Sequence, residues 1–178
     1  MLRTERLDIR PLQRSDLDGL HRMYGDEETM RYSGGSGGAR TRAQTSAGLD
    51  RMIGHQDEYG FGMYALVDRD SGEMVGECGL VHVELKLPEV ELAYYVVRDH
   101  WGRGYATEAA RACLDHGFAD LALDRIIAIA WPENVASHRV MEKAGMTYED
   151  TGTYYGRAMV RYAAELPWPP DGDGGPGG

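Results

Sequence analysis

The most informative segment of the sequence for the fold is Val90-Glu91-Leu92-Ala93-Tyr94-Tyr95-Val96-Val97-Arg98-Asp99-His100-Trp101-Gly102-Arg103-Gly104-Tyr105-Ala106-Thr107. Its first half is rich in β-branched and aromatic side chains, which predicts a strand over residues 90–97. The apolar spacing that follows predicts a helix over residues 107–121. A strand that passes through a short turn into a helix presents unpaired backbone N–H groups at the positive end of the helix dipole. Such a turn is suited to bind phosphate.

Two glycines and one cation strengthen the prediction of a phosphate site. Gly102 and Gly104 allow the backbone to approach an anion closely, and Arg103 adds a positive charge. A dinucleotide fingerprint of the Rossmann type is excluded, because it needs a third glycine where Thr107 stands. A P-loop is excluded as well, since it requires a longer gap and a lysine. The turn therefore predicts a different phosphate-bearing ligand.

Predicted strands and helices alternate along the rest of the chain. Strands are predicted over residues 7–12, 62–67, 74–80, 90–97 and 125–130, with a closing hairpin over 147–164. Helices are predicted from Ser15-Asp16-Leu17 onward and over residues 41–55, 107–121 and 134–144. This order indicates an α/β (mixed α+β) fold, a mixed sheet with helices on its faces. A chain of 178 residues favours one domain, predicted to span residues 1–166.

Two segments are predicted to lack regular structure. Residues 33–39 consist of serine, glycine and alanine and are expected to form a mobile loop, which lacks the Lys-Ser/Thr ending of a P-loop. Residues 167–178 are dominated by proline, glycine and aspartate and are expected to be a disordered tail. Trp168 is the exception, because its side chain could dock on the sheet.

The turn after the central strand also carries a family resemblance. Trp101-Gly102-Arg103-Gly104-Tyr105-Ala106 resembles the pyrophosphate loop of the GNAT N-acetyltransferases, whose motif is Gln/Arg-x-x-Gly-x-Gly/Ala. Tryptophan in the first place is typical of the branch that resembles the ribosomal-protein N-terminal acetyltransferases. Further matches follow in the family's order at residues 4–12, 76–80, 90–97, 124–126 and 134–146. The resemblance implies the GNAT fold, a central, twisted, mixed but mostly antiparallel sheet that splays apart at the coenzyme site, with helices on both faces.

The same resemblance implies acetyl-CoA as the co-substrate and assigns residues to it. The pyrophosphate would be bound by the turn, through Gly102, Arg103, Gly104, Tyr105, Ala106 and Thr107. The strand end would lend backbone groups to the pantetheine arm, through Tyr95, Val96 and Val97. Asn134 would lie beside that arm and Ser137 near the thiol, although Asn134 is equally suited to cap a helix. Lys143 either contacts a phosphate or is solvated.

Acetyl transfer to an amine requires a neutral nucleophile. An exposed lysine amine has a pKa of roughly 10.4 and an α-amine one of roughly 8. Glu91 is the candidate base, because a carboxylate in an apolar strand is costly without a partner or a function; the alternative is a glutamate at a strand edge that faces solvent. Ser137 is the candidate proton donor to the leaving thiolate, and a plain surface serine is the alternative.

Four tyrosines are candidates for lining the acceptor groove, and core packing explains at least half of them equally well. They are Tyr94, Tyr95, Tyr154 and Tyr155.

The composition limits the partners. A formal net charge of -10 disfavours nucleic acid and is compatible with basic substrates, although solubility alone explains it as well. No apolar run approaches the roughly 20 residues of a membrane helix, and the N-terminus has no apolar signal core, so a cytoplasmic protein without membrane contact is expected. A monomer or a homodimer is expected.

Neither the histidines nor the cysteines suggest a metal or a covalent mechanism. The six histidines show no His-Glu-x-x-His spacing, so no metal is predicted. Cys78 and Cys113 are expected to be free buried thiols, with a disulfide as the alternative. An acetyl thioester is already activated, so direct attack in a ternary complex suffices.

Three functions follow from the resemblance. The first is acetylation of a protein N-terminal amine. The second is acetylation of a small amine such as an antibiotic, a polyamine or an amino acid. The third is a non-catalytic sensor that binds acyl-CoA, which needs only the binding motifs. Turnover with an amine separates the first two from the third.

Overall fold

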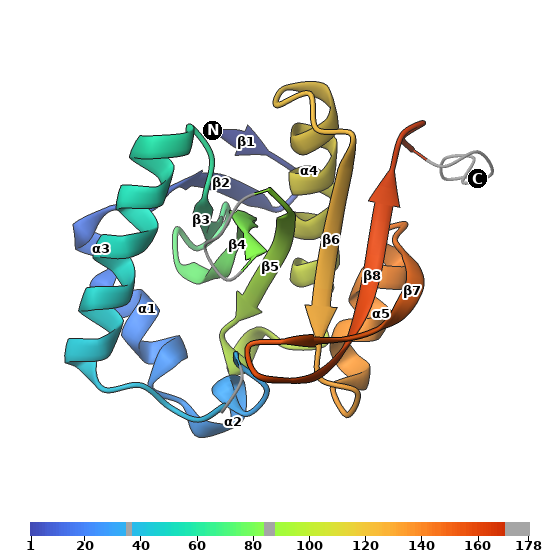
Figure 1. The fold of residues 1–178 in the computed structure, drawn as a ribbon. Coiled ribbons are helices and arrows are strands. Elements are labelled where there is room, and N and C mark those ends of the chain that lie inside the picture. Colours follow the sequence, from blue (N-terminus) through green and yellow to red (C-terminus); the bar gives the residue numbers. More distant parts are fainter. Residues whose placement is uncertain (35–36, 84–87, 170–178) are drawn as a thin grey trace.

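A computed structural model describes residues 1–34, 37–83 and 88–169 (Figure 1). Its strands are β1 (Leu2–Arg3), β2 (Leu7–Pro11), β3 (Met63–Asp68), β4 (Met74–His82), β5 (Val90–Val96), β6 (Arg125–Ala130), β7 (Thr147–Tyr154) and β8 (Arg157–Glu165). Its α-helices are α1 (Leu17–Tyr24), α2 (Glu27–Met30), α3 (Arg42–Tyr59), α4 (Tyr105–Ala119) and α5 (Val135–Lys143).

The strands form one sheet in the order β1-β2-β3-β4-β5-β6-β8-β7. Every neighbouring pair is antiparallel except β5 and β6, which are parallel. Helices α1 and α3 lie on one side of the sheet, and α4 and α5 lie on the other (Figure 1). The predicted fold class, a mixed, mostly antiparallel sheet with helices on both faces, is confirmed.

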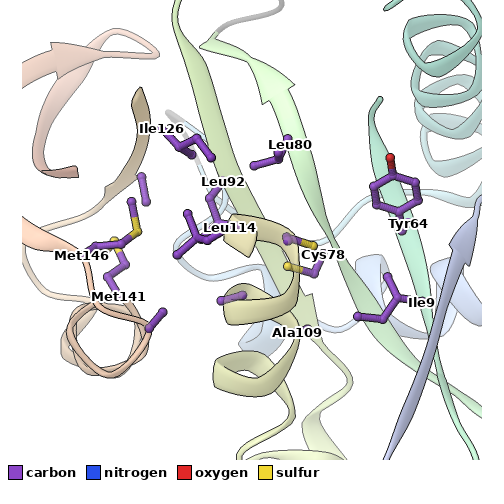
Figure 2. Packing of buried hydrophobic residues seen from close by; sticks show 14 of the residues in the cluster. Ile9, Tyr64, Cys78, Leu80, Leu92, Ala109, Leu114, Ile126, Met141 and Met146 are labelled. Carbon is purple, nitrogen blue, oxygen red and sulfur yellow. The ribbon is translucent and has the colours of Figure 1, made fainter. Parts of the chain in front are cut away.

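Two apolar clusters fill the space between the sheet and its helices. The larger one packs α4 and α5 against the sheet and includes Leu80, Leu92, Leu114 and Ile126 (Figure 2). The smaller one packs α1 and α3 against the other face. Because side chains alternate along a strand, the residues of β5 divide between the two. Leu92, Tyr94 and Val96 face α4, whereas Ala93 and Tyr95 face α1 and α3.

The two cysteines belong to the larger cluster, and the thiol of Cys78 contacts that of Cys113. Cys78 and Cys113 are both free and buried, as predicted. Burial raises the pKa of the Cys78 thiol well above its usual range, and contact with Cys113 raises it further.

Several element boundaries differ from the prediction. Helix α4 begins at Tyr105 and not at Thr107, because Gly104 takes the left-handed conformation and serves as its N-cap. Helix α3 continues to Tyr59 and ends where Gly60 takes a φ of 78°. The short helix α2 was not predicted; Asp26 caps it by accepting a hydrogen bond from the backbone N–H of Thr29 at 2.7 Å.

The glycine-rich segment after α2 is described in part. Its predicted mobility concerns Gly35 and Ser36 as well, which lie outside the described residues. The described residues have no helix or strand there, and several backbone groups are hydrogen-bonded. The N–H of Gly37 donates to the carbonyl of Ser33 at 2.8 Å, and the N–H of Gly38 donates to that of Met30 at 2.9 Å.

Trp168, beyond the predicted domain end at residue 166, contacts the folded part of the chain. The Trp168 ring stacks on Phe118 with 5.1 Å between ring centroids, and its indole N–H donates to Asp115 at 2.7 Å. The predicted disorder of residues 170–178 lies outside the described residues.

Truncation tests the contribution of Trp168. A chain that ends at Leu166 is expected to lose about 1–3 kcal/mol of unfolding free energy, because it loses an aromatic stack and a hydrogen bond to a carboxylate. A chain that ends at Pro170 keeps Trp168 and loses no large apolar side chain, so its stability is expected to match the full chain. Urea unfolding of the three proteins measures both differences. Equal midpoints for all three would show that Trp168 contributes nothing.

Candidate active site

The turn predicted to bind phosphate connects β5 to α4. Gly102 and Gly104 have φ angles of 73° and 82°, a region that residues with side chains rarely adopt. A Cβ added at Gly102 would meet nothing within 4 Å, so the surface of the turn is open there. Because Gly104 is the N-cap, the first N–H groups of α4 belong to residues 105–107 and need partners from outside the helix.

The start of the chain holds this turn in place. Arg6 donates from Nη1 to the carbonyl oxygen of Arg103 and from Nε to Glu108, both at 2.7 Å. Glu108 also accepts a hydrogen bond from the Thr4 hydroxyl at 2.5 Å. Since Glu108 lies in the first turn of α4, its carboxylate complements the helix dipole and ties the helix to the residues before β2.

Strands β5 and β6 separate next to this turn. β5 pairs with β4 as far as Val96, and β6 pairs with β8 as far as Ala130. Between β5 and β6 themselves, the only residue pair in the described chain is Glu91 with Ile127. The sheet is therefore splayed beyond Glu91, as the resemblance implied, and the facing backbone edges are open to a ligand.

Helix α5 places polar groups beside the splay. Asn134 caps the helix by accepting a hydrogen bond from the N–H of Ser137 at 3.2 Å. The hydroxyl groups of Ser137 and Tyr94 lie 2.6 Å apart, and that of Tyr94 also donates to the Ser137 carbonyl at 3.0 Å. Burial raises the pKa of the Tyr94 hydroxyl more than this contact lowers it, so Tyr94 stays protonated.

A cleft of about 620 Å³ joins the turn, the end of β5 and α5. Most of the residues assigned to the coenzyme from the sequence line it: Tyr95, Val96, Gly102, Gly104, Tyr105, Ala106, Thr107, Asn134, Ser137 and Lys143.

Val97 and Arg103 are not among the residues that line this cleft. The N–H of Val97 donates to Val75 at 2.8 Å and its carbonyl accepts from His100 at 2.9 Å, so its backbone already has partners in the protein. Arg103 is exposed, and its carbonyl accepts the hydrogen bond from Arg6. The spacing of the motif predicted neither arrangement, because both depend on contacts with distant segments.

The candidate base lies on the other face of β5. Glu91 is buried, with 7% of its surface exposed, and alternation places it on the same face as Ala93 and Tyr95. The Tyr155 hydroxyl, from the turn between β7 and β8, donates to Glu91 at 2.8 Å. Glu91 does not line the cleft itself. It lies at the point where the splay begins, on the opposite face from Ser137.

Another buried carboxyl group, that of Glu77, was not predicted from the sequence. Glu77 on β4 is fully buried, and the hydroxyl of Tyr24 donates to one of its oxygens. Its other oxygen, Oε2, has no hydrogen-bond partner among the described residues. Burial raises the pKa of Glu77 to about 7. The pattern that could have predicted its burial is the position of this glutamate inside the apolar run of residues 74–80.

The far wall of the cleft was also missed. It comes from α2 and the residues after it: Glu28, Thr29, Arg31 and Tyr32. This wall contacts β5, because the hydroxyl of Ser33 lies 3.0 Å from the hydroxyl of Tyr95. A four-residue helix has no periodicity long enough to predict, so no local pattern identified this wall.

Neither a metal-binding cluster nor a membrane-spanning helix occurs among the described residues. No group of three or more His, Cys, Asp and Glu side chains is arranged there to hold a metal ion. None of the helices described is both long and apolar enough to cross a membrane.

Comparison with known proteins assigns the family. Residues 6–147 match the acetyltransferase (GNAT) domain model. The chain is 34% identical to the protein YkkB of Bacillus subtilis, over 89% of this chain and 92% of the relative. It is 29% identical to the spermidine N(1)-acetyltransferase of Escherichia coli K12, over 79% of this chain and 73% of the relative.

A solved structure extends the match to the fold. The acetyltransferase from Agrobacterium tumefaciens superposes with a TM-score of 0.81 at 29% identity, over 92% of this chain and 93% of that one. The resemblance found in the sequence is confirmed at the level of the family. The chain belongs to the GNAT acetyltransferases and is an acetyl-CoA-dependent N-acetyltransferase.

Proposed function

We propose that this enzyme transfers acetyl from acetyl-CoA to a protein N-terminal α-amine by direct attack within a ternary complex. One observation carries the proposal. At the splay between β5 and β6 the cleft reaches both faces of the sheet, with α4 and α5 lining it on one side and Tyr95, on the face that bears Glu91, on the other. A thioester held in the splay is then accessible to an amine from the opposite face.

The residues of the cleft fit the coenzyme chemically. The open turn at Gly102 and the unpaired N–H groups of residues 105–107 suit a pyrophosphate, and Lys143 adds a cation to the lining. The edge of β5 beside Tyr95 and Val96 offers backbone groups to a pantetheine arm, apart from the Val96 carbonyl, which already accepts a hydrogen bond from the Trp101 indole N–H at 2.7 Å. When bound, acetyl-CoA supplies an activated thioester, and the protein supplies position and proton transfer.

Two side chains would move the protons. The amine nitrogen forms a bond to the acetyl carbon, the carbon–sulfur bond breaks, and Glu91 accepts the amine proton directly or through water. The Ser137 hydroxyl, held 2.6 Å from that of Tyr94, would donate a proton to the leaving thiolate and take a proton from solvent in exchange. Glu91 and Ser137 lie on opposite faces of β5. This arrangement suits an amine that arrives on the Glu91 face and a thioester that arrives on the Ser137 face.

Two acceptor classes have support. The tryptophan-led turn and the opening residues 4–12, typical of the ribosomal-protein branch, support an N-terminal amine. The similarity to a spermidine N(1)-acetyltransferase supports a small polyamine as the second candidate. The net charge of -10 is compatible with both, because each acceptor is cationic before it loses its proton.

A screen of acetyl-CoA consumption distinguishes these acceptors. It pairs peptides that have free α-amines with the same peptides acetylated at the N-terminus, and adds di- and polyamines. Turnover that requires the free α-amine supports the proposal. Turnover with polyamines alone would assign the second candidate, and binding of acetyl-CoA without turnover in the whole panel would assign a sensor.

The order of events gives a prediction about kinetics. Initial-rate plots for acetyl-CoA and amine are expected to intersect, and no acetyl-enzyme is expected to accumulate. A covalent route needs an accessible thiol, and both cysteines are buried between the sheet and α4. Parallel lines, or an acetylated cysteine whose replacement by alanine abolishes turnover, would contradict direct attack. Mass spectrometry of the enzyme during turnover supplies the second readout.

A further inference from the structure

Three segments that are distant in the sequence meet at Trp131. This residue directly follows β6, at the open end of the splay. Its indole N–H donates to the carbonyl of Gly34 at 2.7 Å, and its ring lies edge-to-face with Tyr32 at a centroid distance of 5.5 Å. The guanidinium of Arg157, at the start of β8, lies 3.4 Å from the centre of the same ring. Trp131 therefore links the segment after α2 to the last hairpin.

Two further contacts connect β5 to the segment after α2 and to the last hairpin. Ser33, next to Tyr32 and Gly34, has its hydroxyl 3.0 Å from that of Tyr95. In the hairpin turn, Tyr155 donates its hydrogen bond to Glu91. The contacts thus form a closed ring that runs from β5 through the hairpin, Trp131 and the segment after α2, and back to β5. Figure 1 shows the hairpin tip and the segment after α2 meeting below the ends of β5 and β6.

The ring surrounds the acceptor side of the splay. Glu91 and Tyr95, its two points on β5, lie on the face opposite to Ser137. They are four residues apart, which is roughly 13 Å along an extended strand. The side chains of the ring take part of that span, so less than this distance is left for an acceptor that reaches the splay between them. The backbone of Trp131 is held as well, because its carbonyl lies 3.1 Å from Nε2 of His138 on α5.

From this geometry we propose that Trp131 is a specificity-determining residue, which restricts the acceptor to a slender chain ending in a primary amine and excludes amines carried on bulky ring systems. The inference rests on the proposed function and narrows its substrate class. Trp131 acts by position: it holds the segment after α2 and the hairpin at a fixed separation. A slender acceptor makes contacts along its whole length inside the ring, and these contacts lower its KM.

Paired kinetics test the role of Trp131. The acceptors are an alanine-initiated peptide and a linear diamine for the slender class, and a multi-ring aminoglycoside for the bulky class. In Trp131→Ala, kcat/KM for the slender acceptors is expected to fall about tenfold through KM, whereas that for the bulky acceptor is unchanged or rises. The KM for acetyl-CoA is expected to change less than the KM for the slender acceptors, because Trp131 itself does not line the coenzyme cleft and only its neighbour Tyr32 does.

Two further variants separate position from folding. Trp131→Phe keeps a ring for Tyr32 and Arg157 but loses the N–H bond to Gly34, so its preference is expected to lie between those of the wild type and Trp131→Ala. Arg157→Ala removes the hairpin side of the link at a half-buried residue and is expected to relax the preference while leaving the melting temperature near that of the wild type.

Equal losses on slender and bulky acceptors in both alanine variants would overturn the proposal, as would a wild type that prefers the bulky amine. Wild-type protein that binds acetyl-CoA but turns over neither class gives a distinguishable result. It contradicts the proposed transfer itself, and the proposal about Trp131 falls with it.

Discussion

Replacing Gly104 by valine is expected to weaken acetyl-CoA binding about tenfold or more. Gly104 has a φ of 82° and caps α4, and a branched side chain in that conformation is strained. Relief of the strain would rotate the backbone that presents the first N–H groups of α4, which we assign to the pyrophosphate. Calorimetric titration with acetyl-CoA measures the loss, after circular dichroism shows that the variant is folded.

Gly72 offers a matched control for this substitution. It has a φ of 71° in the turn between β3 and β4, and nothing lies within 4 Å of an added Cβ. Gly72→Val is therefore expected to carry a similar backbone strain and to leave the affinity for acetyl-CoA unchanged. A folded Gly104→Val protein with wild-type affinity would remove the turn from the coenzyme site.

Replacing Glu91 by glutamine is expected to lower kcat about 100-fold at neutral pH, the scale of a lost general base. An α-amine has a pKa of roughly 8, so at neutral pH most of the acceptor must lose a proton before it attacks. At a pH above about 9 the amine is already neutral, and the deficit is expected to shrink. The measurement is the pH–rate profile of both proteins with one α-amine acceptor.

Glu89→Gln is the control for Glu91. Glu89 is exposed two residues earlier and pairs with Arg161 at 3.8 Å, so its loss removes the same charge without touching the splay. Its profile is expected to match the wild type. Glu91→Gln with normal turnover at neutral pH and unchanged acetyl-CoA affinity would exclude Glu91 as the base.

Local patterns predicted the parts of this molecule that depend on neighbouring residues. The turn at Gly102 and Gly104, the strand before it and the helix capped by Asn134 were all predicted, because glycine conformation, strand composition and capping are local properties. The sequence left open which of the tyrosines packs in the core, and the structure places Tyr94 and Tyr95 on opposite faces of β5.

Contacts between distant segments could not be predicted in the same way. The link at Trp131 joins residues 34, 131 and 157, and no spacing within any one segment indicates it. In the described chain, β5 and β6 pair at one residue position. Where two strands pair depends on their register, and the residue pattern of a strand does not define its register when both faces are covered. The sequence allowed Trp168 to dock on the protein, but it could not indicate Phe118 and Asp115 as the partners, since these contacts also join distant segments.

A crystal structure of the wild-type protein with coenzyme A would locate the coenzyme directly. We expect the pyrophosphate within hydrogen-bond distance of backbone N–H groups in residues 103–107, the pantetheine arm along β5 in the splay, and the thiol beside Ser137. A coenzyme bound elsewhere, or one whose thiol ends away from the splay between β5 and β6, would contradict this expectation.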